Sequence, residues 1–119
     1  MSDQVISFAL VGEGESSAPD PERVLAGNPP QQVWNAFSSP DGCFHTGRWS
    51  STPGLWRVRY NEYELCHLLS GAVRLTTDEG GTWVFRAGDS FLINKDFVGT
   101  WETLQHCVKL YAVYQAAGN

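Results

Sequence analysis

The sequence has no long apolar run and no cluster of basic residues. A membrane helix needs roughly 18 or more consecutive apolar residues, so a transmembrane segment is excluded and no membrane partner is expected. Eight Lys and Arg stand against thirteen Asp and Glu, a formal net charge of -5, so binding to nucleic acid through phosphate neutralisation is not expected. Residues 1–11 contain Asp3 and no basic stretch, which argues against a signal peptide.

Cysteine is also scarce. Cys43, Cys66 and Cys107 are odd in number and share no short spacing. This pattern fits neither a zinc ribbon nor a disulfide framework. We expect buried free thiols and a cytoplasmic location, where thiols stay reduced.

The chain does contain enough apolar residues to fold, and many residues that interrupt regular structure. Of its 119 residues 42% are hydrophobic, and it has twelve Gly and six Pro. This length suits one domain, and no stretch keeps a helical apolar repeat over three turns. An acidic, Gly- and Pro-containing loop over residues 12–21 predicts an N-terminal arm or linker over 1–23, followed by a single domain over 24–119.

Short β-rich segments recur regularly from residue 43 onward. Spacings of about 8–12 residues between such segments are typical of an antiparallel sandwich or barrel. Residues 39–42 form a type I turn sequence, and residues 78–81 form a hairpin signal. After a short ordered piece over 31–37, the predicted strands are 43–50, 55–60, 64–70, 72–77 (with Gly71 as a break between these two), 82–86, 90–93, 98–103 and 107–114.

Several rare residue types follow one another in a recognisable order between residues 46 and 114. They are Trp49, Thr52-Pro53-Gly54, Trp56-Arg57-Val58, Tyr60-x-Glu62-x-Glu64, His67-x-x-Ser70-Gly71, Ala87-Gly88-Asp89-Ser90-Phe91, Gly99-Thr100-Trp101-Glu102-Thr103 and Lys109-x-Tyr111. On these residues the chain resembles the cupin superfamily, in particular the small single-domain cupins grouped with ureidoglycine aminohydrolase and the ethanolamine-utilisation Q proteins. The resemblance implies an all-β fold, an antiparallel double-stranded β-helix (jelly-roll barrel) with an N-terminal arm.

The resemblance also implies a metal site of three histidines and one glutamate, and this chain departs from it. Glu64, six further residues and Gly71 fit the second half of the first cupin motif. The histidine positions fall on Val58, Tyr60 and Gly99, so three of the four ligands are lost. We therefore expect no metal ligand and no cofactor, except that Glu62 with Glu64 could hold a divalent cation weakly through hard oxygen donors.

Strand alternation places residues of the same parity as Glu64 inside the barrel. A buried, unpaired carboxylate is costly, so Glu62 and Glu64 need a cation, a shared proton or a ligand that donates hydrogen bonds. Lys109 can be the internal partner, and a bound amine or ureido group can equally fill this role. The alternative is that these groups are solvated at the mouth or edge of the barrel. The predicted ligand-binding residues are Tyr60, Glu62, Glu64, Trp101, Lys109 and Tyr111.

No catalytic residue is assigned. His67 has the opposite parity to Glu64 and should face away from the pocket, while His45 and His106 are expected at the surface or an interface. Cys66 shares the parity of Glu64 but has no neighbouring histidine base on that face, which favours an inert buried thiol. Trp101 either fills core volume or lines the pocket and donates its indole N–H.

The segment 64–70 carries apolar residues on both faces: Cys66 and Leu68 on one, Leu65 and Leu69 on the other. Either the arm or a second subunit must cover the outer face, and the family resemblance favours a homodimer.

The predicted function is metal-independent binding of a small nitrogenous or polar metabolite. The alternatives are an enzyme resembling ureidoglycine aminohydrolase with a reduced metal site, and a structural or regulatory cupin with a vestigial pocket; fold alone does not choose among them.

Overall fold

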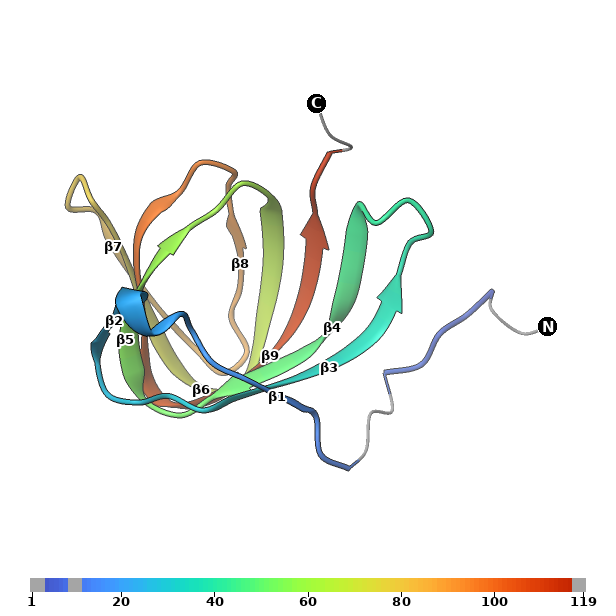
Figure 1. The fold of residues 1–119 in the computed structure, drawn as a ribbon, viewed down its shortest axis with the longest axis horizontal. Helices are drawn as coiled ribbons and strands as arrows, with labels where there is room; N and C mark the ends of the chain where they lie inside the picture. Colours follow the sequence, from blue (N-terminus) through green and yellow to red (C-terminus); the bar gives the residue numbers. More distant parts are fainter. Residues whose placement is uncertain (1–3, 9–11, 117–119) are drawn as a thin grey trace.

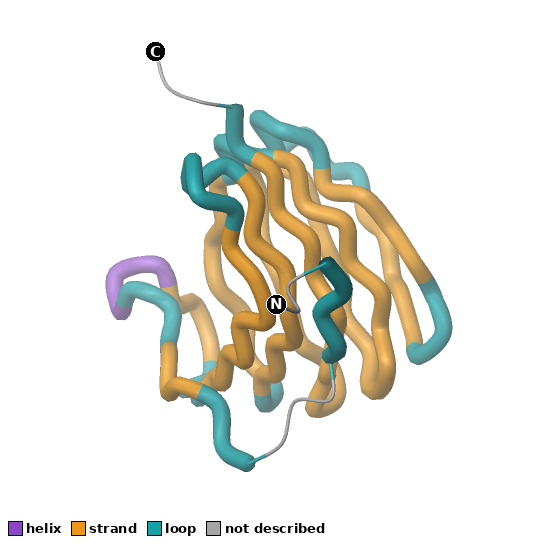
Figure 2. The backbone as a smooth tube through the Cα atoms, turned by 90° about the vertical axis from the view of Figure 1, so that its right-hand side faces the viewer, coloured by secondary structure: helices purple, strands orange, loops and turns teal. Residues whose placement is uncertain are grey.

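The computed structural model describes residues 4–8 and 12–116. In these ranges the chain forms nine β-strands and one short 3-10 turn, so strands make up most of the backbone (Figure 2). The elements are β1 (Glu15–Ser17), η1 (Pro21–Arg23), β2 (Val24–Ala26), β3 (Gln31–Ser38), β4 (Phe44–Ser51), β5 (Gly54–Arg59), β6 (Tyr63–Thr77), β7 (Thr82–Arg86), β8 (Ser90–Ile93) and β9 (Val98–Tyr114). Within the described ranges the three-residue η1 is the sole helical element, and no helix could cross a membrane.

Two long strands, β6 and β9, connect the two walls of the fold. They pair antiparallel from Tyr63 opposite Tyr114 to Thr77 opposite Gly99. Beyond one half of β9 lie β4, β3 and β1, while β5 and β2 lie beyond its other half. On its free side β6 pairs with β8 and β7. The strands curve around a common interior (Figure 1), which confirms the predicted all-β antiparallel jelly-roll barrel.

The prediction of separate strands on either side of Gly71, and of a break between residues 103 and 107, was wrong. Both regions continue as single strands that bend, and the pairing register of β6 with β9 shifts between Leu68 and Val73. Gly71 has φ +86°, and a Cβ there would collide with the backbone oxygen of His106. The glycine therefore marks a bulge where the two backbones approach closely, because such irregularities bend a strand without ending it.

The hairpin and turn signals are confirmed. Thr77 N donates to Gly81 O (2.8 Å) in the turn between β6 and β7, and Gly42 N donates to Ser39 O (2.9 Å) in the turn before β4. The predicted strands over residues 82–86 and 90–93 match β7 and β8 residue for residue.

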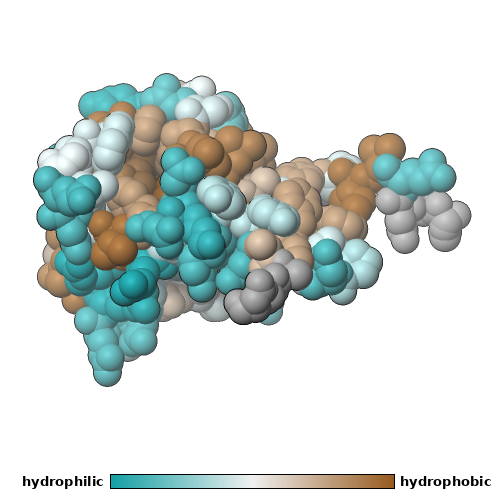
Figure 3. All heavy atoms as spheres, turned by 90° about the horizontal axis from the view of Figure 1, so that it is seen from above, coloured by the Kyte–Doolittle hydropathy of each residue, from teal (hydrophilic) through white to brown (hydrophobic). Residues whose placement is uncertain are grey.

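The described part of the N-terminal segment has more structure than the predicted loop over residues 12–21. Within it, β1 pairs with the edge of β3, placing Glu15 opposite Val33, and the indole N–H of Trp34 donates to Gly12 O (3.1 Å). Asp20 caps η1 by accepting a hydrogen bond from Glu22 N (3.2 Å). Residues 4–8 stand clear of the barrel (Figures 1 and 3), and Val5 is exposed.

The apolar core lies between the two walls. Its buried members come mainly from the inward-facing positions of β6, β9 and β5. They are Trp56, Cys66, Leu68, Val73, Leu75, Ile93, Trp101 and Cys107. The inward parity predicted for Cys66 and Leu68 is confirmed, because both side chains have no exposed surface.

Candidate functional site

A cavity of about 600 Å³ lies inside the barrel, a size typical of small-molecule sites. Strands β3, β4, β5, β6 and β9 form its walls, and residues of the segment before β2 contribute to its mouth. The structure brings all of the predicted ligand-binding side chains to this one cavity: Tyr60, Glu62, Glu64, Trp101, Lys109 and Tyr111.

A buried ion pair lies in the cavity wall. Lys109 Nζ is 2.9 Å from Glu64 Oε2, and both side chains are less than a tenth exposed. The ammonium also lies 3.7 Å from Cys66 Sγ, and 4.5 and 4.4 Å from the ring centroids of Trp49 and Trp101, within cation–π range. Of the two positions considered for Lys109, the solvated edge is therefore wrong, and Lys109 is the internal partner of Glu64.

The groups around this pair have shifted pKa values. Burial raises the pKa of the Tyr60 hydroxyl well above its ordinary value, and the negative charge of Glu64 raises it further, so Tyr60 is a neutral phenol at pH 7. Burial also raises the pKa of the Cys66 thiol, to about 12. Burial by itself would lower the pKa of Lys109, but Cys66 and Glu64 beside the ammonium outweigh it and the pKa is raised. Lys109 is therefore charged at pH 7, whereas Cys66 is neutral.

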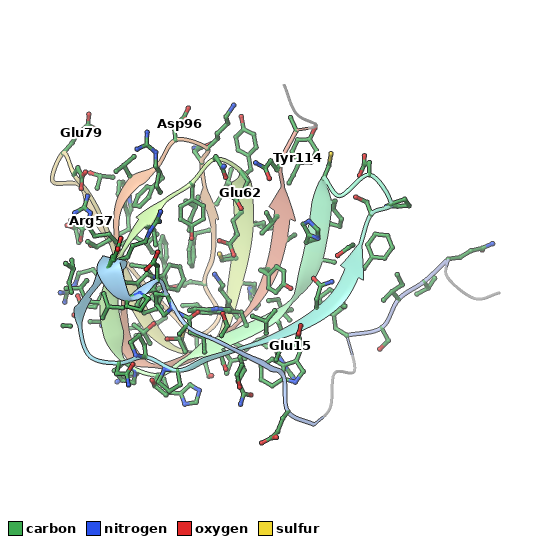
Figure 4. All side chains as sticks on the ribbon, viewed as in Figure 1. Glu15, Arg57, Glu62, Glu79, Asp96 and Tyr114 are labelled. Atoms are coloured by element: carbon green, nitrogen blue, oxygen red, sulfur yellow. The ribbon has the colours of Figure 1, made fainter. Side chains whose placement is uncertain are left out.

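Two polar residues of the predicted set lie farther from the pair. The Tyr111 hydroxyl donates to Asn35 Oδ1 (2.8 Å), and its pKa is raised by burial and then by Glu64. Glu62, just before β6, is partly buried, and its Oε1 accepts a hydrogen bond from Asn61 N (3.2 Å). Figure 4 shows Glu62 over the interior of the barrel, so it can meet a molecule that enters the cavity.

Trp101 forms part of the cavity wall as a ring and not as a hydrogen-bond donor. Its indole N–H donates to Thr103 Oγ1 (2.9 Å). The ring stacks at 26° to Trp56 and meets Trp49 edge-on at a centroid distance of 5.4 Å. Of the two positions considered for Trp101, the structure shows both, because the ring is buried in the core and also lines the cavity. Its N–H is already used within the protein.

The predicted ligand-binding set lacks four charged residues that line the cavity: Asp20, Arg23, Arg57 and Arg59. The sequence suggested Arg57 and Arg59 only as partners for a glutamate at the barrel mouth, and gave no indication of Asp20 and Arg23. Strand alternation places Arg57 and Arg59 on the opposite side of β5 from Val58, which suggests an outer face. They contribute to the cavity because β2 and η1 pack beside β5, as Figure 4 shows around Arg57. No periodic signal in the sequence reveals this packing.

The three histidines do not line the cavity. His67 Nδ1 lies 2.8 Å from Ser90 Oγ, between β6 and β8, and His45 Nδ1 lies 2.7 Å from Ser38 Oγ. His106 is exposed. The expectation that these residues stay outside the pocket is confirmed.

Comparisons with known proteins agree with this architecture. Residues 38–111 match the sequence profile of the EutQ-like cupin domain. A Pseudomonas syringae protein of unknown function from the DUF861 family is 25% identical with a TM-score of 0.77, over 89% of this chain and 45% of that one. The EutQ proteins of Salmonella typhimurium and Clostridium difficile are 20% and 17% identical, with TM-scores of 0.63 and 0.66, over 76% and 86% of this chain and 72% and 82% of theirs.

The jelly-roll barrel with its internal cavity defines a cupin. Since the matching profile covers more than half of the residues, the chain belongs to the EutQ-like cupin domain family. No curated protein matches it significantly. The chain spans less than half the length of the Pseudomonas relative, which is itself of unknown function.

The residues at the cupin metal positions do not fit a metal ion. Val58 offers a hydrocarbon, and a Cβ at Gly99 would collide with the backbone oxygen of Thr76, so no imidazole can be placed there. The Glu64 carboxylate already binds the Lys109 ammonium, whose charge opposes a second cation beside it. Across residues 4–8 and 12–116, no three His, Cys, Asp or Glu side chains gather as a metal-binding group.

Proposed function

We propose that this cupin binds a small polar metabolite in the barrel cavity without a metal ion. One observation supports the proposal most: a solvent-open cavity of about 600 Å³ is lined by both aromatic rings and polar groups, and its carboxylate Glu64 is neutralised internally by Lys109. Apolar walls with a few placed polar groups are the usual composition of small-molecule sites.

Binding has more support than catalysis. A nucleophile or general base needs a pKa near the working pH, yet the Cys66 thiol has a pKa of about 12 and the pKa of Lys109 is raised. No histidine lines the cavity among the residues that the structure describes. A vestigial pocket has less support, because bulky residues have not filled this volume.

Saturable binding, lost when the cavity is filled, tests the proposal. Val33 lines the cavity, whereas Val84 lies exposed on β7 outside it. We expect at least one member of a panel of small anionic, cationic, zwitterionic and neutral metabolites to bind wild type with one-to-one stoichiometry by calorimetry. Val33→Phe should abolish this binding and Val84→Phe should not. Binding that survives Val33→Phe, or no binding by any panel member at millimolar concentration, would contradict the proposal.

The metal-independent part is tested separately. Protein purified without a metal-chelating column should contain substoichiometric transition metal by elemental analysis, and metabolite binding should persist after dialysis against a chelator. Stoichiometric nickel, iron, manganese or zinc that survives dialysis and is lost in Glu64→Gln would overturn it and favour the enzyme alternative.

We also propose that the protein is a homodimer. On the outer face of β6 and β8, Leu65 and Leu92 are paired neighbours, 53% and 55% exposed. Tyr63 and Tyr114 form a second exposed pair next to them. The described arm does not cover this face, because β1 pairs with β3 at the other side of the sheet and residues 4–8 stand clear of the barrel. An exposed apolar patch of this kind fits a self-complementary contact with a second copy.

We further propose a cytoplasmic location. Cys43, Cys66 and Cys107 are all free and buried. Free thiols persist in a reducing compartment, whereas oxidising compartments favour disulfides. Cell fractionation should find the protein with cytoplasmic markers, and recovery from an oxidising compartment would contradict this.

A further inference from the structure

Basic residues form a larger share of the charged residues at the cavity than in the rest of the chain. Four of the eight Lys and Arg residues line it, against three of the thirteen Asp and Glu. The lining therefore carries a formal charge of +1, against -6 for the remainder of the chain. The cavity therefore differs in charge from the rest of the chain, whose acidic residues outnumber its basic ones.

The acidic groups that line the cavity already accept hydrogen bonds from the protein. Glu64 accepts from Lys109 Nζ at 2.9 Å. At the mouth, Asp20 Oδ1 accepts from Glu22 N and Glu62 Oε1 accepts from Asn61 N, both at 3.2 Å. Lys109 neutralises Glu64, so the argument for a bound amine at Glu64 is removed. Asp20 and Glu62 accept from backbone N–H groups and keep their negative charges.

Some of the guanidinium groups that line the cavity mouth make no hydrogen bond within the described part of the chain. Arg57 Nη2 lies 3.0 Å from both carboxylate oxygens of Asp78, which is outside the cavity. The guanidinium groups of Arg23 and Arg59 have no hydrogen-bond or ion-pair partner within the described part of the chain, and both side chains line the cavity. They come from different segments, η1 and β5, which pack beside each other. The cavity lining thus includes guanidinium donors from two segments of the chain.

We propose that the ligand of this cavity carries an oxyanion, a carboxylate or a phosphate, which Arg59 and Arg23 bind at the cavity mouth. The inference rests on the proposed binding function and adds the chemical class of the ligand. A guanidinium offers paired N–H donors in the plane of a carboxylate or phosphate, so two of them can bind one oxyanion by charge-assisted hydrogen bonds. The remainder of the ligand then lies against the Tyr60 hydroxyl and the tryptophan wall.

A set of matched probes tests the ligand class. The probes are succinate, inorganic phosphate, neutral 1,4-butanediol and cationic 1,4-diaminobutane. Each is titrated by calorimetry, at low and high salt, into wild type and into the variants Arg59→Gln, Arg23→Gln and Arg86→Gln. Arg86 is exposed and lies outside the cavity, so Arg86→Gln controls for the loss of one positive charge. These arginines are exposed, so the variants should fold, and circular dichroism verifies this.

We expect at least one of the two anions to bind more tightly than the diol and the diamine, and more weakly at high salt. Arg59→Gln and Arg23→Gln should each weaken anion binding by roughly three- to tenfold, and Arg86→Gln should leave it unchanged. The stronger anion identifies the source as a carboxylate or a phosphate. Tighter binding of the diamine, equal effects of all three substitutions, or no binding of either anion would overturn this inference. The proposed function has its own test: it is contradicted only if no member of the wider metabolite panel binds.

Discussion

Lys109 on β9 and Glu64 on β6 form a hydrogen-bonded ion pair inside the barrel, with Nζ 2.9 Å from Oε2, although the two residues are 45 positions apart in the chain. Glu64 is the one metal-ligand position of the cupin motifs at which this sequence keeps the motif residue. An ammonium of the protein itself therefore neutralises that carboxylate, and the Trp49 and Trp101 rings pack against the same ammonium.

Breaking one side of this pair should destabilise the protein strongly. Lys109→Met leaves the Glu64 carboxylate buried without a partner, and removing one member of a buried pair costs about 3–5 kcal/mol. Urea unfolding followed by circular dichroism should show a loss of this size in the free energy of unfolding.

The matched control is the double variant Lys109→Met/Glu64→Gln, which removes the uncompensated charge. Since the cost comes mainly from that charge, the double variant should be more stable than Lys109→Met alone. If Lys109→Met does not fold, the double variant should still fold. A double variant that is as unstable as the single one would show that Lys109 contributes by packing and not by charge.

Stability should fall on the alkaline side because of the buried thiol. Burial raises the pKa of Cys66 from 9.0 to about 12, so the fold favours the neutral form. The resulting stabilisation is complete below pH 9.0 and is lost as the pH rises from there toward 12. Lys109 and Tyr60 also have raised pKa values, so their contributions likewise decline only above the ordinary values of 10.5 and 10.0.

Between pH 9 and 10, unfolding free energies should fall less steeply in Cys66→Ala and Cys66→Val than in wild type. The difference in slope should approach ~1.4 kcal/mol per pH unit, the value for one proton. The two variants leave different volumes unfilled, so their absolute stabilities will differ while their slopes agree. Equal slopes in wild type and both variants would mean that the thiol ionises without cost in the folded state.

The oligomeric state should depend on the outer face of β6. Light scattering should give twice the chain mass of 13.2 kDa for wild type, and Leu65→Asp should convert the protein to a monomer. The control is Leu25→Asp, since Leu25 is similarly exposed but lies on β2, away from this face. A wild-type monomer at micromolar concentration, or an effect of Leu25→Asp equal to that of Leu65→Asp, would contradict the proposed interface.

Local patterns predicted much of the fold. Alternation placed Cys66 and Leu68 inside and Leu65 and Leu69 outside, and turn signals located the ends of β7 and β8. The same reasoning failed at Gly71, where a glycine in a β-rich run was taken for a break. Its conformation accommodates a bulge next to β9, and that requirement comes from Gln105, His106 and Cys107, which are distant from Gly71 in the sequence.

The sequence by itself determined the all-β fold, because strand periodicity is a local property. Its resemblance to cupins, now confirmed by the family match, placed Val58, Tyr60 and Gly99 at the histidine ligand positions. Alternation along each strand also predicted which side chains face the barrel interior, since residues of one parity share a face of the strand. Only the tertiary structure decided that Lys109 is the partner of Glu64, and that Arg23 and Arg59 line one cavity. These relationships depend on register, on the bends of β6 and β9, and on the packing of η1 beside β5, which join residues far apart in the chain.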